Sequence, residues 1–156
     1  MYETEYKRKF LVVIDETPEC ERALTFAAYR VKRTGGTVVL MSVIEKPEFI
    51  GLGVEDVLRA EAVEEAERNL DARLARIRDI GEVRSESVIR EGNAAEEIER
   101  VIDQDRDIAI LVLAASTSGE GPGPLVMHFA GRANALPIPL TVVPGRMSDE
   151  EIIAIC

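Results

Sequence analysis

The chain has 156 residues, of which 46% are hydrophobic, and a formal net charge of -10 at pH 7. This length predicts a single domain. The acidic balance argues against nucleic acid or an anionic membrane as a partner, because both need Lys and Arg to meet phosphate. No apolar run approaches the ~18 residues of a membrane span, the first residues lack the layout of a signal peptide, and two cysteines are too few for a disulfide framework or a zinc cluster. We therefore expect a cytoplasmic protein with reduced thiols.

The first part of the chain has the pattern strand, helix, strand. Residues 9–15 form a short apolar run rich in β-branched side chains, which is typical of a buried strand. Thr17 and Pro18 follow and predict the start of a helix, because they suit an N-cap and a first helical position. Residues 37–44 repeat the buried-strand pattern.

The middle of the chain predicts a long helix, an edge strand and a shorter helix. Residues 54–80 carry apolar side chains at steps of three and four, and their other faces are densely charged, which is typical of a helix with a solvated outer surface. Residues 82–92 are more polar and predict a strand at a sheet edge. Asn93, with Glu96 three residues later, predicts the start of a helix that runs to about Asp103.

The last third begins with another strongly apolar run, residues 107–114, which predicts a buried strand. A loop rich in glycine and proline follows and leads into a helical segment. Residues 138–145 form the last predicted strand, and Ser148 is placed to cap a final apolar turn.

Strands that alternate with helices predict parallel pairing and right-handed crossovers. We therefore expect an α/β fold, a single doubly wound domain with a five-stranded parallel sheet in the order 3-2-1-4-5 and helices on both faces. The domain would span residues 1–146. Residues 147–156 would form a C-terminal tail whose short helix packs on its own protomer or on a dimer partner.

The predicted strand order also predicts where a ligand would bind. Open α/β sheets bind ligands beyond the carboxyl ends of their strands, where the strand order reverses. Strands 1 and 4 meet there, so Asp15 and the Gly/Pro loop after strand 4 should converge. Glycine lets backbone N–H groups approach an anion, and a helix N-terminus adds a favourable partial charge. The alternative is that the loop only turns the chain, since neither GxGxxG nor the Walker pattern is present.

Four segments carry a resemblance to a known family: FLVVIDETPECERAL, VVLMSVIE, VIREGNAAEEI and the closing ILVLAA…LPIPLTVVPG. Over roughly residues 7–146 the chain resembles the universal stress protein family. The resemblance implies a five-stranded parallel α/β fold and a homodimer in which the last strands of two protomers lie against each other. It also implies, as in many members, a bound adenine nucleotide such as ATP, with Mg²⁺.

The ATP-binding members of that family carry G-x2-G-x9-G-[ST] after strand 4, and the chain departs from this pattern. One alignment keeps the spacing, with Ser118 in the first glycine position, Gly121 in the second, and Gly131 and Arg132 at the end. A second alignment, anchored on the strand, places Ala114 in the first glycine position and treats GEGPGP as an insertion. Both alignments remain open.

The resemblance further implies which residues would line a nucleotide site. The base and ribose end would be formed by Val13, Ile14, Asp15 and Val43. The phosphate end would be formed by Ala114, Ser116, Gly119, Gly121, Gly131 and Arg132.

Several of the polar side chains allow a second interpretation. Asp15 either contacts the ligand or bonds the loop backbone beside the first helix. Arg132 either clamps a phosphate or fills the pocket by pairing with Asp15 or Glu120. Cys20, near a helix start, is either a reactive thiolate or a small buried residue. His128 has no nucleophile or acid at a recognisable motif spacing.

We therefore expect a homodimeric regulatory or stress-response protein that binds an adenine nucleotide, with no catalytic or metal-ligating residues and no enzymatic activity. The dimer would form through Leu140 to Val143 of the last strand and through the C-terminal tail, because an exposed strand edge can pair with its own copy across a two-fold axis. The alternative is a dimeric protein-interaction module of the same fold that binds no nucleotide.

Overall fold

Five strands and five helices alternate along residues 8–45 and 54–156, the part of the chain that the computed structural model describes. The strands are β1 (Lys9–Val13), β2 (Thr37–Ile44), β3 (Arg84–Glu91), β4 (Ile108–Ala115) and β5 (Leu140–Pro144). The helices are α1 (Cys20–Thr34), α2 (Glu55–Ile80), α3 (Ala94–Gln104), α4 (Pro124–Gly131) and α5 (Asp149–Ile155). The strands pair in parallel in the order β3-β2-β1-β4-β5, which confirms the predicted fold class and strand order.

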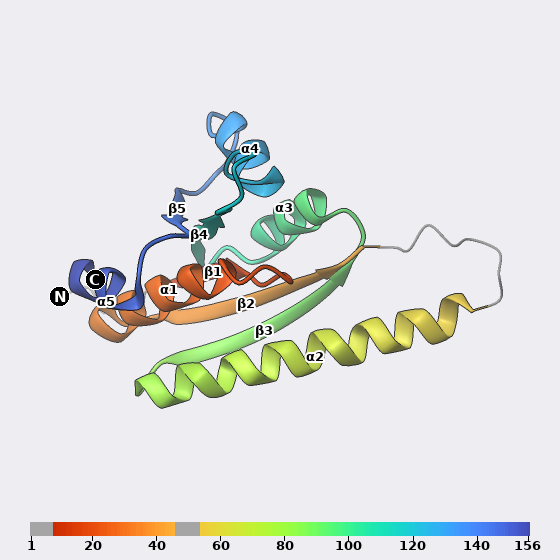
Figure 1. Cartoon of the computed structure of the whole chain (residues 1–156), viewed down its shortest axis with the longest axis horizontal. Coiled ribbons are helices and arrows are strands. Elements are labelled where there is room, and N and C mark those ends of the chain that lie inside the picture. Colours follow the sequence, from red (N-terminus) through yellow and green to blue (C-terminus); the bar gives the residue numbers. More distant parts are fainter. Residues whose placement is uncertain (1–7, 46–53) are drawn as a thin grey trace.

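The central strands are apolar on both faces, because helices cover both faces of the sheet. Successive side chains of a strand point to opposite faces of the sheet. Val12 and Val112 therefore pack in the cluster under α1, α2 and α5, whereas Leu11 and Leu111 pack in the cluster under α3 and α4. Figure 1 shows these layers, with α3 and α4 on one side of the sheet and α2 on the other.

Two helices begin at the caps that the sequence predicts. The side chain of Asn93 accepts a hydrogen bond from the backbone N–H of Glu96 at 3.1 Å, which satisfies one of the free donors at the start of α3. Ser148 and Glu151 form a complete capping box at the start of α5.

Helix α1 starts later than expected. It begins at Cys20, with Glu19 at the N-cap and no side-chain cap, so the predicted start at Thr17 and Pro18 is wrong by about two residues. The backbone N–H and the hydroxyl of Thr17 both donate to Oδ1 of Asp15, at 2.8 and 2.5 Å. The hydroxyl expected to cap the helix is therefore engaged by the carboxylate at the end of β1.

The two edges of the sheet are β3 and β5. Strand β3 is the polar one, as the sequence predicts for an edge. Strand β5 pairs with β4 from Leu111↔Leu140 to Ala115↔Pro144, and Val142 on it is 37% exposed.

The C-terminal tail packs on its own chain. Ile152 and Cys156 are buried in the same apolar cluster as the inner face of α1. The thiol of Cys156 lies 3.7 Å from the carbonyl oxygen of Phe26 on α1. On the outer face of α5, Ile153 and Ile155 are 41% and 61% exposed.

Candidate functional site

The strand order places a crevice between the carboxyl ends of β1 and β4. These two strands are neighbours, but β1 leads into α1 on one face of the sheet and β4 leads into α4 on the other. The two connections diverge, and the space between them is where open α/β sheets bind their ligands.

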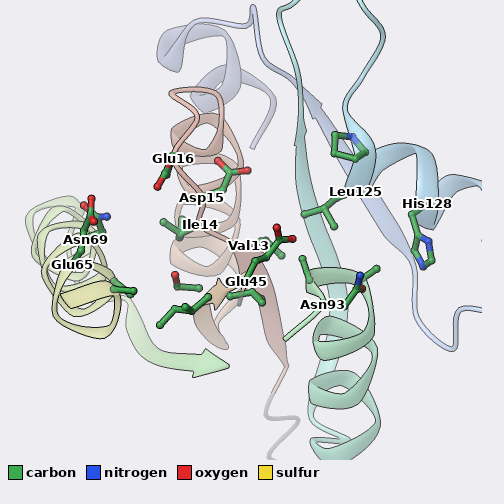
Figure 2. Close-up of a pocket in the computed structure, with 18 residues that line it drawn as sticks. Val13, Ile14, Asp15, Glu16, Glu45, Glu65, Asn69, Asn93, Leu125 and His128 are labelled. Carbon is green, nitrogen blue, oxygen red and sulfur yellow. The ribbon is translucent and has the colours of Figure 1, made fainter. Parts of the chain in front are cut away.

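The larger of two hollows at this edge, which we call the α2–α3 cavity, has a volume of about 700 Å³. The ends of β1 and β2, one face of α2 and the first turns of α3 and α4 enclose it. In Figure 2, Glu65 and Asn69 lie on one side of this cavity and Asn93, Leu125 and His128 on the other. Its remaining lining residues are Val13, Ile14, Asp15, Glu16, Ser42, Val43, Ile44, Glu45, Ala62, Ala66, Ala94, Ala95 and Pro124.

A second hollow, the loop cavity, has a volume of about 490 Å³. Residues before and within α1, the end of β4 and the Gly/Pro loop before α4 line it. Val13, Asp15, Pro124 and Leu125 line both cavities, so the two hollows adjoin. Together they form one candidate site that runs from α2 to the loop.

Asp15 stands at the junction of the two cavities. Its carboxylate accepts two hydrogen bonds from Thr17, which fix its position at the end of β1. Both interpretations of Asp15 are therefore compatible with its place, because a carboxylate bonded to the loop backbone also faces the cavity (Figure 2).

The Gly/Pro loop is held by bonds within itself. The N–H of Ser116 donates to the carbonyl of Pro122 at 2.9 Å, and the N–H of Ser118 donates to Oγ of Ser116 at 3.1 Å. Gly121 and Gly123 have φ of +101°, a conformation that favours glycine over other residues. The loop thus has a defined turn that leads directly into α4.

The loop is also tied to the start of α1. The hydroxyl of Thr117 donates to the carboxylate of Glu19, and this bond holds the pKa of Glu19 below its usual range. Glu19 is therefore ionised at neutral pH and faces the loop cavity.

Most of the residues expected to hold a nucleotide meet at this site. Val13, Ile14, Asp15 and Val43 line the α2–α3 cavity. The loop cavity is lined by Val13, Asp15, Ala114, Ser116 and Gly121. Gly119 lies in the same loop, between the lining residues Ser118 and Glu120, with open space around its Cα.

Gly131 and Arg132 do not join them. They lie at the end of α4, whose length of eight residues separates them from the loop by roughly 12 Å. The guanidinium Nε of Arg132 lies 3.1 Å from the Glu99 carboxylate on α3, so Arg132 pairs with neither Asp15 nor Glu120. Ala114 and the loop residues therefore line the cavity. Gly131 and Arg132, which close the alignment that keeps the family spacing, do not.

Sequence reasoning misses the contributions of α2, α3 and α4. Asn69 lines the cavity from a helix whose polar residues are typical of solvated surface, and Asn93 has the signature of a cap alone. Leu125 carries no signal of its own, although Pro124 directly before it marks the start of a helix at the crevice. No local signal identifies Asn69, because its place depends on how α2 crosses the sheet.

The other candidate groups have structural surroundings. Cys20 is buried, and burial raises the pKa of its thiol, so the interpretation as a buried residue fits better than that of a reactive thiolate. His128 lies with Nε2 3.3 Å from Oε1 of Glu99. Within residues 8–45 and 54–156, no three side chains of the metal-binding types come together. In the same part of the chain, every helix is too short or too polar to span a bilayer.

Comparisons with known proteins support the family resemblance. The family model described as the universal stress protein family matches residues 7–144. No curated protein matches the chain.

Solved structures show the same fold at low sequence identity. The universal stress protein UspA from Lactobacillus plantarum superposes with a TM-score of 0.73 at 19% identity, covering 88% of this chain and 97% of that one. A universal stress protein family member from Arabidopsis thaliana with AMP bound gives 0.63 at 17% identity, covering 92% and 94%. The universal stress protein from Archaeoglobus fulgidus in complex with dAMP gives 0.60 at 17% identity, covering 87% and 97%.

Proposed function

This chain belongs to the universal stress protein family, and from that premise we propose that it binds an adenine nucleotide in the adjoining α2–α3 and loop cavities. The observation that carries the proposal is the position of these cavities at the carboxyl ends of β1 and β4, the place where sheets of this topology bind ligands.

The α2–α3 cavity has the size and chemistry for a base and its sugar. Its volume of about 700 Å³ lies within the usual range of small-molecule sites. Val13, Val43 and Ala66 offer apolar surface for the faces of a purine ring. Asn69 and Asp15 offer the amide and carboxylate groups that hydrogen-bond ring nitrogens or ribose hydroxyls.

The bound ligands of the structural relatives support an adenine nucleotide in particular. The Arabidopsis protein holds AMP and the Archaeoglobus protein holds dAMP. We extend this class of ligand to the present chain because the fold is shared over most of its length. The finer expectation is ATP held with Mg²⁺, whose phosphates would lie toward the loop cavity.

We propose a regulatory binding protein of the cytoplasm rather than an enzyme, with a role in the response to stress. Its homodimer would form through Leu140 to Val143 of β5, which is an edge strand. The exposed faces of Ile153 and Ile155 on α5 would extend that interface. Nucleotide binding would then act by changing the conformation or partners of the dimer.

The direct test has two steps. The purified protein is denatured and its supernatant is analysed for released nucleotides, and the folded protein is titrated calorimetrically with AMP and with Mg-ATP. A nucleotide at about 100 times its dissociation constant adds about 2.7 kcal/mol to the stability of the folded state, which a melting curve detects.

A pair of matched substitutions localises the binding. Val43→Phe places an aromatic ring in the α2–α3 cavity and should abolish nucleotide binding. Val57→Phe makes the same change on the exposed side of α2, at a residue 59% exposed that lines neither cavity, and should leave binding unchanged. Equal affinities of the two variants would place the ligand elsewhere.

The second candidate function is the interaction module that binds no nucleotide. The observation that favours it is the internal bonding of the loop, whose Ser116 and Ser118 N–H groups are already engaged. This second function predicts a stable dimer that releases no nucleotide on denaturation. Added nucleotide would leave its melting temperature unchanged.

A further inference from the structure

The charges around the two cavities bear on which adenine nucleotide can bind, and this inference rests on the proposed function. We infer that the site selects its ligand by low negative charge, so that it takes AMP in preference to metal-free ATP. The selecting groups are the carboxylates that line the cavities, with Glu120 and Glu19 nearest the phosphate end.

Acidic side chains line both cavities. The lining carboxylates are Asp15, Glu16, Glu19, Glu45, Glu65 and Glu120. Among the described residues no Lys or Arg lines either cavity, and His128 is the only other titratable side chain there besides the thiol of Cys20. A polyphosphate would therefore approach like charges from more than one element.

Three arginines of α2 and α4 are engaged by carboxylates of other helices. Arg132 at the end of α4 pairs with Glu99. On α2, Arg73 lies 2.9 Å and Arg76 lies 2.6 Å from the carboxylate of Glu21 on α1. These three guanidinium groups are paired with carboxylates outside the cavities, so none of the three supplies the bidentate clamp that polyphosphate sites use.

Part of the loop backbone is unavailable to phosphate oxygens. The N–H groups of Ser116 and Ser118 are bonded within the loop, and prolines 122 and 124 have no N–H. The first turn of α4 leaves the N–H groups of Leu125 and Val126 without intrahelical partners. Two adjacent donors at a helix N-terminus can hold a single phosphate, whereas the further phosphates of ATP would face the carboxylates of the loop cavity.

The carboxylates do not themselves form a metal site, because no group of three metal-binding side chains comes together in residues 8–45 and 54–156. Their effect on a ligand is therefore repulsion over several ångströms. Each such interaction is small near water, about 1 kcal/mol at 4 Å, but the contributions add for a ligand with several charges. They also weaken as salt screens them.

The test compares AMP and ATP by calorimetry in a chelator at low salt. We expect AMP to bind at least about tenfold more tightly than metal-free ATP, a difference of about 1.4 kcal/mol. Added Mg²⁺ should raise the affinity for ATP, because it neutralises part of the phosphate charge. Raising the salt concentration should narrow the difference between the two nucleotides.

Three variants assign the selectivity to the loop cavity. Glu120→Gln should tighten the binding of ATP by about threefold and change the affinity for AMP less, because it removes one negative charge at the phosphate end. Glu120→Lys should tighten the binding of ATP further, because it also places one positive charge there. Glu82→Gln is the matched control. It removes one exposed charge just before β3, at the opposite end of the strands, and should change neither affinity.

The outcomes separate this inference from the proposed function. If ATP without metal binds as tightly as AMP, or if Glu120→Lys leaves both affinities unchanged, the charge selection is wrong and nucleotide binding stands. If neither nucleotide binds under any condition, the proposed function fails and the selectivity fails with it.

Discussion

The two ends of the candidate site are built in different ways. The α2–α3 cavity is formed by strand ends and helix faces, and its walls follow from the order of the sheet and the packing of α2 and α3. The loop cavity lies between the start of α1, the end of β4 and one irregular segment, residues 116–123. This segment is held by its own hydrogen bonds and by the bond from Thr117 to Glu19. Fold membership therefore predicts the first cavity, whereas the chemistry of the second depends on a few loop residues.

The largest expected effect comes from forcing the loop away from β5. A Cβ added at Gly145 would overlap the carbonyl oxygen of Ala115 and lie 2.7 Å from Cγ of Glu19. We expect Gly145→Ala to cost about 2 kcal/mol of stability, as overpacking typically does, and to lower the melting temperature by about 4–8 °C. The same substitution should lower the affinity for nucleotides, because it displaces the loop that would contact the phosphates. The affinity for adenosine, which has no phosphate, should change less.

Gly119 supplies the matched control for that change. It lies in the same loop, its φ is not positive, and no atom lies within 4 Å of the place that a Cβ would take. Gly119→Ala should therefore leave the melting temperature close to that of the parent chain. An equal loss in both variants would mean that the close approach at Gly145 does not shape the loop.

The second prediction separates the two roles of Asp15. Asp15→Ala removes a carboxylate that faces both cavities and bonds Thr17. We expect adenine nucleotide affinity to fall by about tenfold, as for the loss of one hydrogen bond that involves a charged group. Thr17→Val removes only the hydroxyl partner, so it should lower stability by about 0.5–1 kcal/mol with little change in affinity.

Calorimetry and thermal unfolding of the two variants check this prediction. A loss of affinity that is the same in both would show that Asp15 acts by holding the turn, and not by contacting the ligand.

The contrast between the two cavities also explains what the sequence can predict. Short β-branched runs that alternate with helices predict a parallel sheet, for which 3-2-1-4-5 is a common strand order. Asn93 and Ser148 mark the starts of their helices by local capping patterns. The start of α1 is misplaced because the hydroxyl of Thr17 has two possible partners, and the partner it takes, Asp15, is visible only once β1 is seen to end at Val13.

The candidate site, like the fold, is predictable where topology places a residue and not where packing does. Residues at strand ends, such as Val13 and Val43, can be found because topology alone places them at the crevice. Asn69 cannot be found in this way, because the sequence does not show the angle at which α2 crosses the sheet. Gly131 and Arg132 are placed by counting residues, and counting does not show that α4 carries them away from the loop.

A smaller effect is expected for the thiol at the boundary of the loop cavity. Cys20 is 2% exposed, and burial raises the pKa of its thiol. Because the thiolate is the reactive form, we expect alkylation of Cys20 at neutral pH to be at least about tenfold slower in the folded protein than in the unfolded one. Peptide mapping after timed alkylation measures this, and fast labelling of Cys20 in the folded chain would show that the loop opens readily.

The smallest effect concerns the bond that ties the loop to α1. The hydroxyl of Thr117 lowers the pKa of Glu19 in the folded state. A carboxylate with a lowered pKa stabilises the fold above its unfolded value of about 4.3, and this contribution is lost as the pH falls through the folded pKa. The melting temperature of the parent chain should therefore exceed that of Glu19→Gln slightly at pH 7, and the difference should shrink as the pH falls below the unfolded pKa of about 4.3. A difference that stays constant over this range would mean that the charge on Glu19 adds nothing to the contact, and that the loop is held to α1 by packing around Gly145 alone.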